Sequence, residues 1–285
     1  MRVSPPRIFP HATRAAKPPI GADGSADAYR QVSFLLADDV DLVLEGLNLE
    51  GAVAEASSAA KYRTQTMASA LGLWSRSWLT RLQALHAVEW GNYIGALPLI
   101  RSAADYQAAA LYLLRTGAAE WEAWLASDGI ALAADEHATQ YVLHAFRAAE
   151  VLAVHETLGP IYRAATDLSL SHFGATLMLT ASDSTVDRVL MTFGDRDFHL
   201  GLAEMLLGWL LLLGAAQVES LMEFEGVFAL PDSAALTAFC GRARARAGES
   251  SRCSIETLND PAGDARYLVR NWRRAPGAAA KRLLL

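Results

Sequence analysis

The chain has 285 residues, of which 52% are hydrophobic and 20% charged, and its formal net charge is −6. This apolar content excludes a disordered chain, and the length is sufficient for a large buried core in one or two domains. The two cysteines, Cys240 and Cys253, have no CxxC spacing and are too few for a disulfide framework. A reducing, cytoplasmic location is therefore expected.

Half of the ten prolines lie in the first 19 residues, and proline disfavours regular helix and sheet. This predicts an extended or disordered arm over residues 1–26. From residue 27 to residue 247, helix-forming residues with an apolar periodicity predict a bundle domain. Its first helix is expected in AYRQVSFLLADDVDLVLEGL, residues 28–47, followed by one long helix or two over residues 52–94.

Pro98 predicts a kink or a fresh helix start, because it removes one backbone hydrogen bond. Further helices are expected over 118–127, 133–157, 160–180, 197–222 and 231–247, with a weak strand over 185–195 and a short helix over 264–274. The pattern predicts an all-α, multi-helix bundle of about seven to nine helices. Residues 248–285 are expected to form a basic, loop-rich tail.

The run HLGLAEMLLGWLLLLGAAQV, residues 199–218, is nearly as apolar as a short membrane span. Glu204 interrupts it, and no basic residues flank it. Both features favour a helix buried in protein, so we expect a soluble chain without membrane contact.

The charge is unevenly distributed, because residues 241–285 carry ten Lys/Arg against four Asp/Glu. An acidic body with a basic end predicts that the tail docks on its own body or on a neighbouring copy. Contact with RNA through Arg242, Arg244, Arg246 and Arg252 is the alternative. No aromatic residue lies among these arginines to stack on bases.

Metal or cofactor binding is not expected from the sequence. Three histidines follow one stripe, but His137 and His155 would lie about 27 Å apart on a helix. The acidic group Asp38, Asp41 and Glu45 resembles a diphosphate-binding cluster, yet its spacing is also that of the solvated face of a helix.

The sequence TRLQALHAVEW contains Arg81 and His86 with four residues between them. This spacing resembles that of the HEPN ribonucleases, which are α-helical dimers. The resemblance implies that His86 handles the proton of the 2′-hydroxyl while Arg81 stabilises the phosphate. Leu82 departs from the family pattern, which has a polar residue directly after the arginine.

The segment LPLIRSAADYQAAALYLL, residues 97–114, contains the only charges between Glu89 and Arg115. These are Arg101 and Asp105, which lie four residues apart in an otherwise apolar helix. The spacing allows the two side chains to bond each other. A charged pair on a helix that is apolar nearly all round indicates an inner polar site or a narrow solvated stripe.

The stretch LQALHAVEWGNYIGALPLIRSAADYQAAALYLL and the later IYRAATDLSLSHFGATLML resemble an uncharacterised bacterial all-helical family. That family has a helix with an arginine four residues before an acid, and a later helix with tyrosine and Ser-x-x-His. The positions that match these motifs are Arg101, Asp105, Tyr162, Ser169 and His172. The resemblance implies that these residues share one polar pocket.

Such a pocket could bind a small anionic ligand, hold a histidine for acid–base catalysis, or simply fix the register of the helices. We therefore expect a helical bundle protein that self-associates as a homo-oligomer and carries this cluster. The alternative is a HEPN-like, metal-independent ribonuclease of a toxin or defence system. The sequence leaves open whether the protein is an enzyme.

Overall fold

The computed structural model describes residues 3–58, 65–116, 148–185, 187–259 and 265–285. Its helices are α1 (Asp23–Leu35), α2 (Ala37–Ser57), α3 (Gln65–Glu89), α4 (Tyr93–Arg115), α6 (Ala148–Val154), α7 (Leu158–Ser169), α8 (Phe173–Thr180), α9 (Leu200–Glu223) and α10 (Ser233–Ala247). These nine helices, counted over the described residues, confirm the predicted helical bundle. The helix expected over 118–127, and most of that over 133–157, lies outside the described residues.

Helix α9 forms the centre of the bundle, as its apolar sequence predicts. It packs against α2, α3, α4, α7 and α10, and nearly all its residues are buried. Among the described helices it alone is long and apolar enough to cross a membrane, and 94% of its most apolar 18-residue window is buried within the protein.

Glu204, the charge that interrupts this apolar helix, connects α9 to the C-terminal segment. Its carboxylate accepts from Arg273 at 2.7 Å and from the backbone N–H of Cys253 at 2.9 Å. The first amides of α9 also bond to this segment, because Leu200 and Gly201 donate to the carbonyls of Arg274 and Arg273. Glu204 therefore has a structural function in the described contacts.

The expectation of a loop-rich tail with a short helix over 264–274 is wrong. Residues 248–285 instead contain a three-stranded antiparallel sheet, ordered β1 (Ser254–Asn259), β2 (Ala265–Trp272) and β3 (Lys281–Leu284). Alternate residues of β2, namely Tyr267 and Val269, are buried. This period of two is the signature of a half-buried strand.

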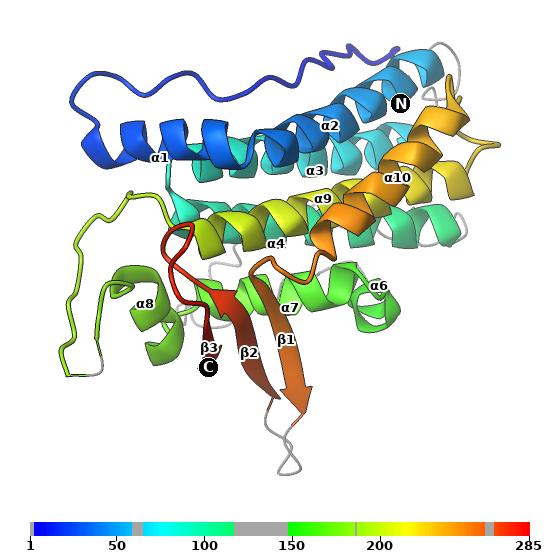
Figure 1. Cartoon of the computed structure of the whole chain (residues 1–285). Coiled ribbons are helices and arrows are strands. Elements are labelled where there is room, and N and C mark those ends of the chain that lie inside the picture. Colours follow the sequence, from blue (N-terminus) through cyan, green and yellow to red (C-terminus); the bar gives the residue numbers. More distant parts are fainter. Residues whose placement is uncertain (1–2, 59–64, 117–147, 186, 260–264) are drawn as a thin grey trace, which may run out of the picture.

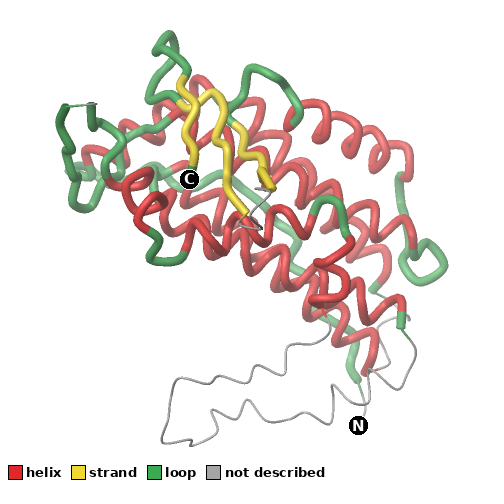
Figure 2. The backbone as a smooth tube through the Cα atoms, turned by 90° about the horizontal axis from the view of Figure 1, so that it is seen from below, coloured by secondary structure: helices red, strands yellow, loops and turns green. Residues whose placement is uncertain are grey.

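The N-terminal arm is extended, and it runs along one side of the bundle over α1 and α2 (Figure 1). The sheet lies on the opposite side, near α7 and α8. Figure 2 shows the three strands crossing that face of the helices. The two ends of the chain therefore cover opposite sides of one helical core.

Two predicted helices are each divided into two. The first breaks at Leu36, between α1 and α2, and the one expected over 160–180 breaks between α7 and α8. The strand expected over 185–195 is absent from the described residues there, which form turns and loop. Val189, Met191 and Phe193 in this loop are exposed, so they bury too little surface to hold a strand in a sheet.

Candidate functional site

The side chain of Arg101 lies between α4 and α7. Its Nε donates to the hydroxyl of Thr166 at 3.2 Å, and a terminal nitrogen donates to the hydroxyl of Tyr162 at 3.0 Å. Its guanidinium carbon lies 5.2 Å from the centroid of the Tyr162 ring. Both acceptors are on one face of α7 because they are four residues apart. We call Arg101, Asp105, Tyr162 and Thr166 the Arg101 cluster.

A second arginine–tyrosine pair flanks this cluster on the side of α3. Arg76 donates to the hydroxyl of Tyr106 at 2.5 Å, and its guanidinium carbon lies 4.0 Å from the centroid of that ring. Asp105, next to Tyr106 on α4, is within electrostatic range of both Arg101 and Arg76. Burial raises the pKa of Asp105 above its usual range, and the two guanidiniums oppose this rise.

The two arginines are paired with neutral groups. Among the described residues, no carboxylate oxygen lies within the 4.0 Å ion-pair distance of Arg101 or Arg76. The ion pair expected between Arg101 and Asp105 is therefore not formed, because Arg101 turns toward the α7 hydroxyls. The cluster combines half-buried positive charge with aromatic surface.

Ser169 and His172 do not join the Arg101 cluster, and they do not share one helix face. Ser169 is the last residue of α7, and its hydroxyl donates to the carbonyl of Ala165 at 2.5 Å. His172 precedes α8 and caps it, since its Nδ1 accepts from the backbone N–H of Ala175 at 3.4 Å. The expected single pocket is thus divided, because the chain leaves the helical conformation at Leu170.

His172 instead lines a separate cavity of about 190 Å³ beside the C-terminal strand, together with Asp167, Tyr267 and Leu285. The Tyr267 hydroxyl donates a short hydrogen bond to the Asp167 carboxylate. Burial, and then this bond, raise the pKa of Tyr267 well above its usual range. This arrangement was not predicted, because the strand that supplies Tyr267 was not predicted.

Arg81 and His86 have different partners. Arg81 is 1% exposed, and its two terminal nitrogens donate to the two oxygens of Glu50 at 2.7 and 2.6 Å. The Nε2 atom of His86 lies 2.8 Å from the carbonyl oxygen of Thr13 in the arm. A phosphate at Arg81 would have to displace a buried carboxylate, so the geometry favours a structural function for this arginine.

The arginines of the basic segment bind carboxylates of the same chain. Arg242 pairs with Glu45 on α2, Arg244 with Glu219 on α9, and Arg246 and Arg252 both with Asp39 on α2. These contacts confirm that this part of the basic end docks on the acidic body. Asp39 therefore differs from the neighbouring carboxylates of α2, because its side chain is fully buried.

Thr166, Arg76 and Tyr106 belong to the site but were not predicted. For Thr166 a signal existed, because it follows Tyr162 by four residues and so extends the same polar face. For Arg76 and Tyr106 no signal existed, because they lie on different helices and meet only through the packing of α3 against α4.

Among the described residues, no group of three His, Cys, Asp or Glu side chains could hold a metal ion. His137 and His144 lie outside those residues. Comparison with known proteins found no matching family model, no matching curated protein and no matching solved structure. Both family resemblances therefore stay predictions from the sequence.

Proposed function

We propose that this protein binds a small oxyanion, such as a phosphate or a carboxylate, at the Arg101 cluster. The supporting observation is a half-buried guanidinium whose partners in the described structure are neutral hydroxyls. A guanidinium presents paired donors that match the oxygens of a carboxylate or phosphate. Such a ligand supplies the negative charge that Thr166 and Tyr162 lack.

The surroundings of Arg101 support this proposal. Partial burial lowers the local dielectric, so a bound anion is attracted more strongly there than at a fully exposed arginine. Arg76 adds a second positive charge, and the rings of Tyr106 and Tyr162 lie under the two guanidiniums. Asp105 acts in the opposite direction, because its ionised form repels an anion.

We propose binding rather than catalysis at this cluster. Acid–base catalysis by a histidine needs its imidazole within hydrogen-bond distance of the ligand. His172, the candidate for that function, lies at the start of α8 beside a different cavity. We therefore propose no reaction for the Arg101 cluster.

Isothermal titration calorimetry with inorganic phosphate, diphosphate and acetate tests the proposal. We expect Arg101→Gln to weaken binding at least about tenfold, because a charged hydrogen-bond donor is lost. The matched control is Arg115→Gln on the same helix, whose exposed pair with Glu223 lies outside the cluster. Equal loss in both variants, or no binding by the wild type, contradicts the proposal.

We also propose that the chain self-associates. The support is a group of exposed apolar side chains on and around α8, namely Leu170, Phe173, Val189, Leu190, Met191 and Phe193. Large apolar side chains that stay exposed in neighbouring segments are candidates for burial against a partner. Analytical ultracentrifugation at micromolar concentration is expected to show a dimer or larger species, and Phe173→Ser with Phe193→Ser to dissociate it. A monomeric wild type contradicts this part.

A further inference from the structure

The N-terminal arm is bound to the bundle through its main chain. The backbone N–H of Ala12 donates to the side chain of Asn48 on α2 at 3.2 Å, and the Asn48 amide donates to the carbonyl of Ala12 at 3.5 Å. The backbone N–H of Ala15 donates to the carboxylate of Glu89, the last residue of α3, at 2.7 Å. Side chains of two helices therefore bind the backbone of one extended segment.

Two further bonds have the same character. The carbonyl oxygen of Thr13 lies 2.8 Å from the Nε2 atom of His86, and the carbonyl of Ala16 accepts from the indole N–H of Trp90 at 2.9 Å. Four side chains thus hold the main chain of residues 12–16, and we call them the arm site: Asn48, His86, Glu89 and Trp90. Bonds to the main chain are open to any peptide with the same backbone conformation.

The side chains of this segment differ in exposure. Ala12 and Ala15 are 8% and 6% exposed, whereas Thr13 and Ala16 are exposed. Close packing leaves little room for a larger residue at the two buried positions. The arm site therefore selects an extended backbone with small side chains at two positions three residues apart, and it leaves the residues at the exposed positions free to vary.

One contact of the arm is incomplete. Arg14 Nε lies 3.3 Å from Oε1 of Glu89 but forms no hydrogen bond with it, and both atoms are buried without another hydrogen-bond partner. Burial raises the pKa of Glu89 above its usual range, and the N–H of Ala15 and the charge of Arg14 oppose this rise. Because unpaired buried polar atoms cost free energy, the arm binds this site less tightly than a segment that satisfies both oxygens of Glu89.

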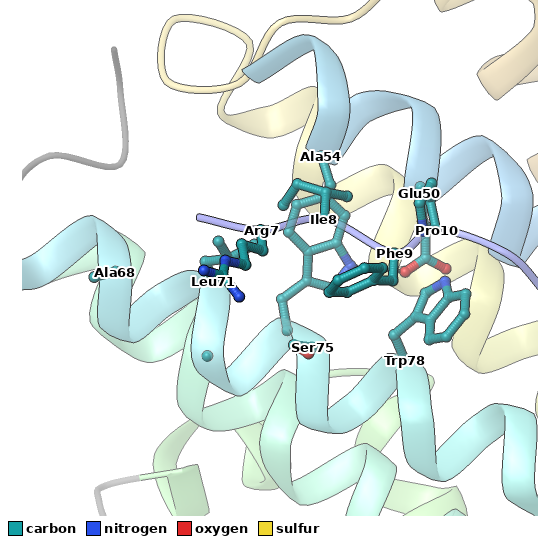
Figure 3. A pocket seen from close by; sticks show the side chains of 13 residues that line it. Arg7, Ile8, Phe9, Pro10, Glu50, Ala54, Ala68, Leu71, Ser75 and Trp78 are labelled. Carbon is teal, nitrogen blue, oxygen red and sulfur yellow. Dashed lines mark hydrogen bonds between the residues drawn. The ribbon is translucent and has the colours of Figure 1, made fainter. Parts of the chain in front are cut away.

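The arm is connected to the bundle through an exposed turn. The N–H of Ala22 donates to the carbonyl of Pro19 at 3.2 Å, Ile20 is fully exposed, and Gly21 has a φ of +91°. Residues 7–10 continue the arm between α2 and α3 (Figure 3), where they line a cavity. The turn can therefore change conformation and release the arm without breaking a bond within α1.

We propose that the arm site is a recognition site for an extended peptide segment of a partner protein, which the arm occupies until the partner displaces it. The partner segment has small side chains at the positions of Ala12 and Ala15. In place of Arg14 it has a residue that donates a hydrogen bond to Oε1 of Glu89. The arm has the advantage of being on the same chain, which corresponds to a millimolar effective concentration, so the incomplete Arg14 contact is what allows a partner to compete.

A labelled arm peptide tests this proposal on the full-length chain. The probe is a fluorescein-labelled peptide with the sequence of residues 7–19, and its binding is followed by fluorescence anisotropy. Ala15→Glu in the protein places a second carboxylate against the buried Glu89, so it releases the arm while leaving the four side chains of the arm site unchanged. The matched control is Ala16→Glu, because the neighbouring side chain is exposed and only its carbonyl is bonded.

We expect Ala15→Glu to bind the peptide at least about tenfold more tightly than wild type or Ala16→Glu, because the competing arm has been removed. Equal affinity in the three proteins, or no binding to any of them, overturns the proposal. Ala12→Glu, at the other buried position, releases the arm independently, and circular dichroism reports whether each variant keeps its helices. Loss of helical signal in both variants overturns the proposal as well, because the arm would then be an integral part of the fold.

Altered peptides test which segment the site selects. Leucine in place of both Ala12 and Ala15 in the peptide is expected to weaken binding to the Ala15→Glu protein at least about tenfold, because larger side chains do not fit the packed positions. Leucine in place of both Thr13 and Ala16 should leave the affinity within about twofold, since these side chains are exposed. The two peptides have the same charge, so equal affinities would overturn the assignment of the buried positions.

Discussion

Arg81 and Arg101 both enter the helical bundle, but their charges are balanced differently. Arg81 makes two hydrogen bonds to Glu50, and both side chains are almost completely buried. Arg101 is half-buried and donates to two neutral hydroxyls. The positive charge of Arg81 is neutralised by a carboxylate of the protein. The positive charge of Arg101 has no such partner among the described residues, so a bound anion can neutralise it.

This difference separates a structural arginine from a candidate binding arginine. A buried ion pair costs desolvation that its partner must compensate, so removing one member leaves an unfavourable charge. A guanidinium at a partly solvated helix surface keeps some of its hydration and depends less on its neighbours. Position along the sequence does not reveal the difference, because both arginines lie in helices of similar apolar character.

The largest expected effect is on stability. Arg81→Met leaves the Glu50 carboxylate buried with only Trp74 as a donor, and we expect the free energy of unfolding to fall by about 3–5 kcal/mol. Arg101→Met removes two hydrogen bonds to hydroxyls that water can replace, so we expect a loss below about 1 kcal/mol. Urea unfolding followed by circular dichroism measures both. Similar losses would remove the distinction between the two sites.

The helices of this fold were largely predictable, because most of their stabilising contacts follow an apolar periodicity. Helix α9 is apolar along most of its length, with Glu204 as the one charge in its most apolar run. Helix α10 follows Asp232, whose side chain accepts from the N–H of Ala235 at 2.9 Å, as an N-cap should. The sheet was not predictable in this way. In β2 the buried residues are Tyr267, Val269 and Trp272. Arginines and loop-forming residues surround them, so the segment has the composition of a basic tail.

The candidate site was predictable in part. The spacing of Arg101 and Asp105, and the match at Tyr162, placed three residues that do lie together at the α4–α7 contact. Ser169 and His172 were expected on the same helix as Tyr162, but the backbone leaves the helical conformation at Leu170, where ψ is 160°. A helical pattern in sequence does not show where one helix ends and the next begins when no proline or glycine marks the break.

The second effect concerns the pH dependence of anion binding at the Arg101 cluster. The raised pKa of Asp105 means that its carboxyl retains a proton to higher pH than usual. As the pH falls through this pKa, Asp105 becomes neutral while Arg101 on α4 and Arg76 on α3 stay positive. Tyr106 and Tyr162 are the other titratable groups nearby. Anion affinity is therefore expected to increase as the pH falls.

Asp105→Asn tests this expectation. The variant should bind phosphate up to about fivefold more tightly than wild type at pH 7, since the repelling charge is removed at a partly exposed site. Acetate and sulfate, titrated in parallel, distinguish the protonation of Asp105 from that of the ligand. The affinity of the variant for sulfate should not change with pH over the range in which that of wild type does. A pH response retained in the variant would assign the titration to another group.

The smallest effect is expected at Arg242. Unlike Arg81 it is exposed, and unlike Arg101 it has a carboxylate partner, Glu45. Its pair with Glu45 lies on the surface, with 54% and 38% of the two side chains accessible. Exposed pairs contribute little, so Arg242→Gln should change the free energy of unfolding by less than about 0.5 kcal/mol. Phosphate affinity should not change, because this guanidinium is outside the cluster and has a carboxylate partner. A loss of phosphate affinity as large as that of Arg101→Gln would mean that anions bind exposed arginines of this protein in general. In that case the lack of a carboxylate partner at Arg101 would not explain where anions bind.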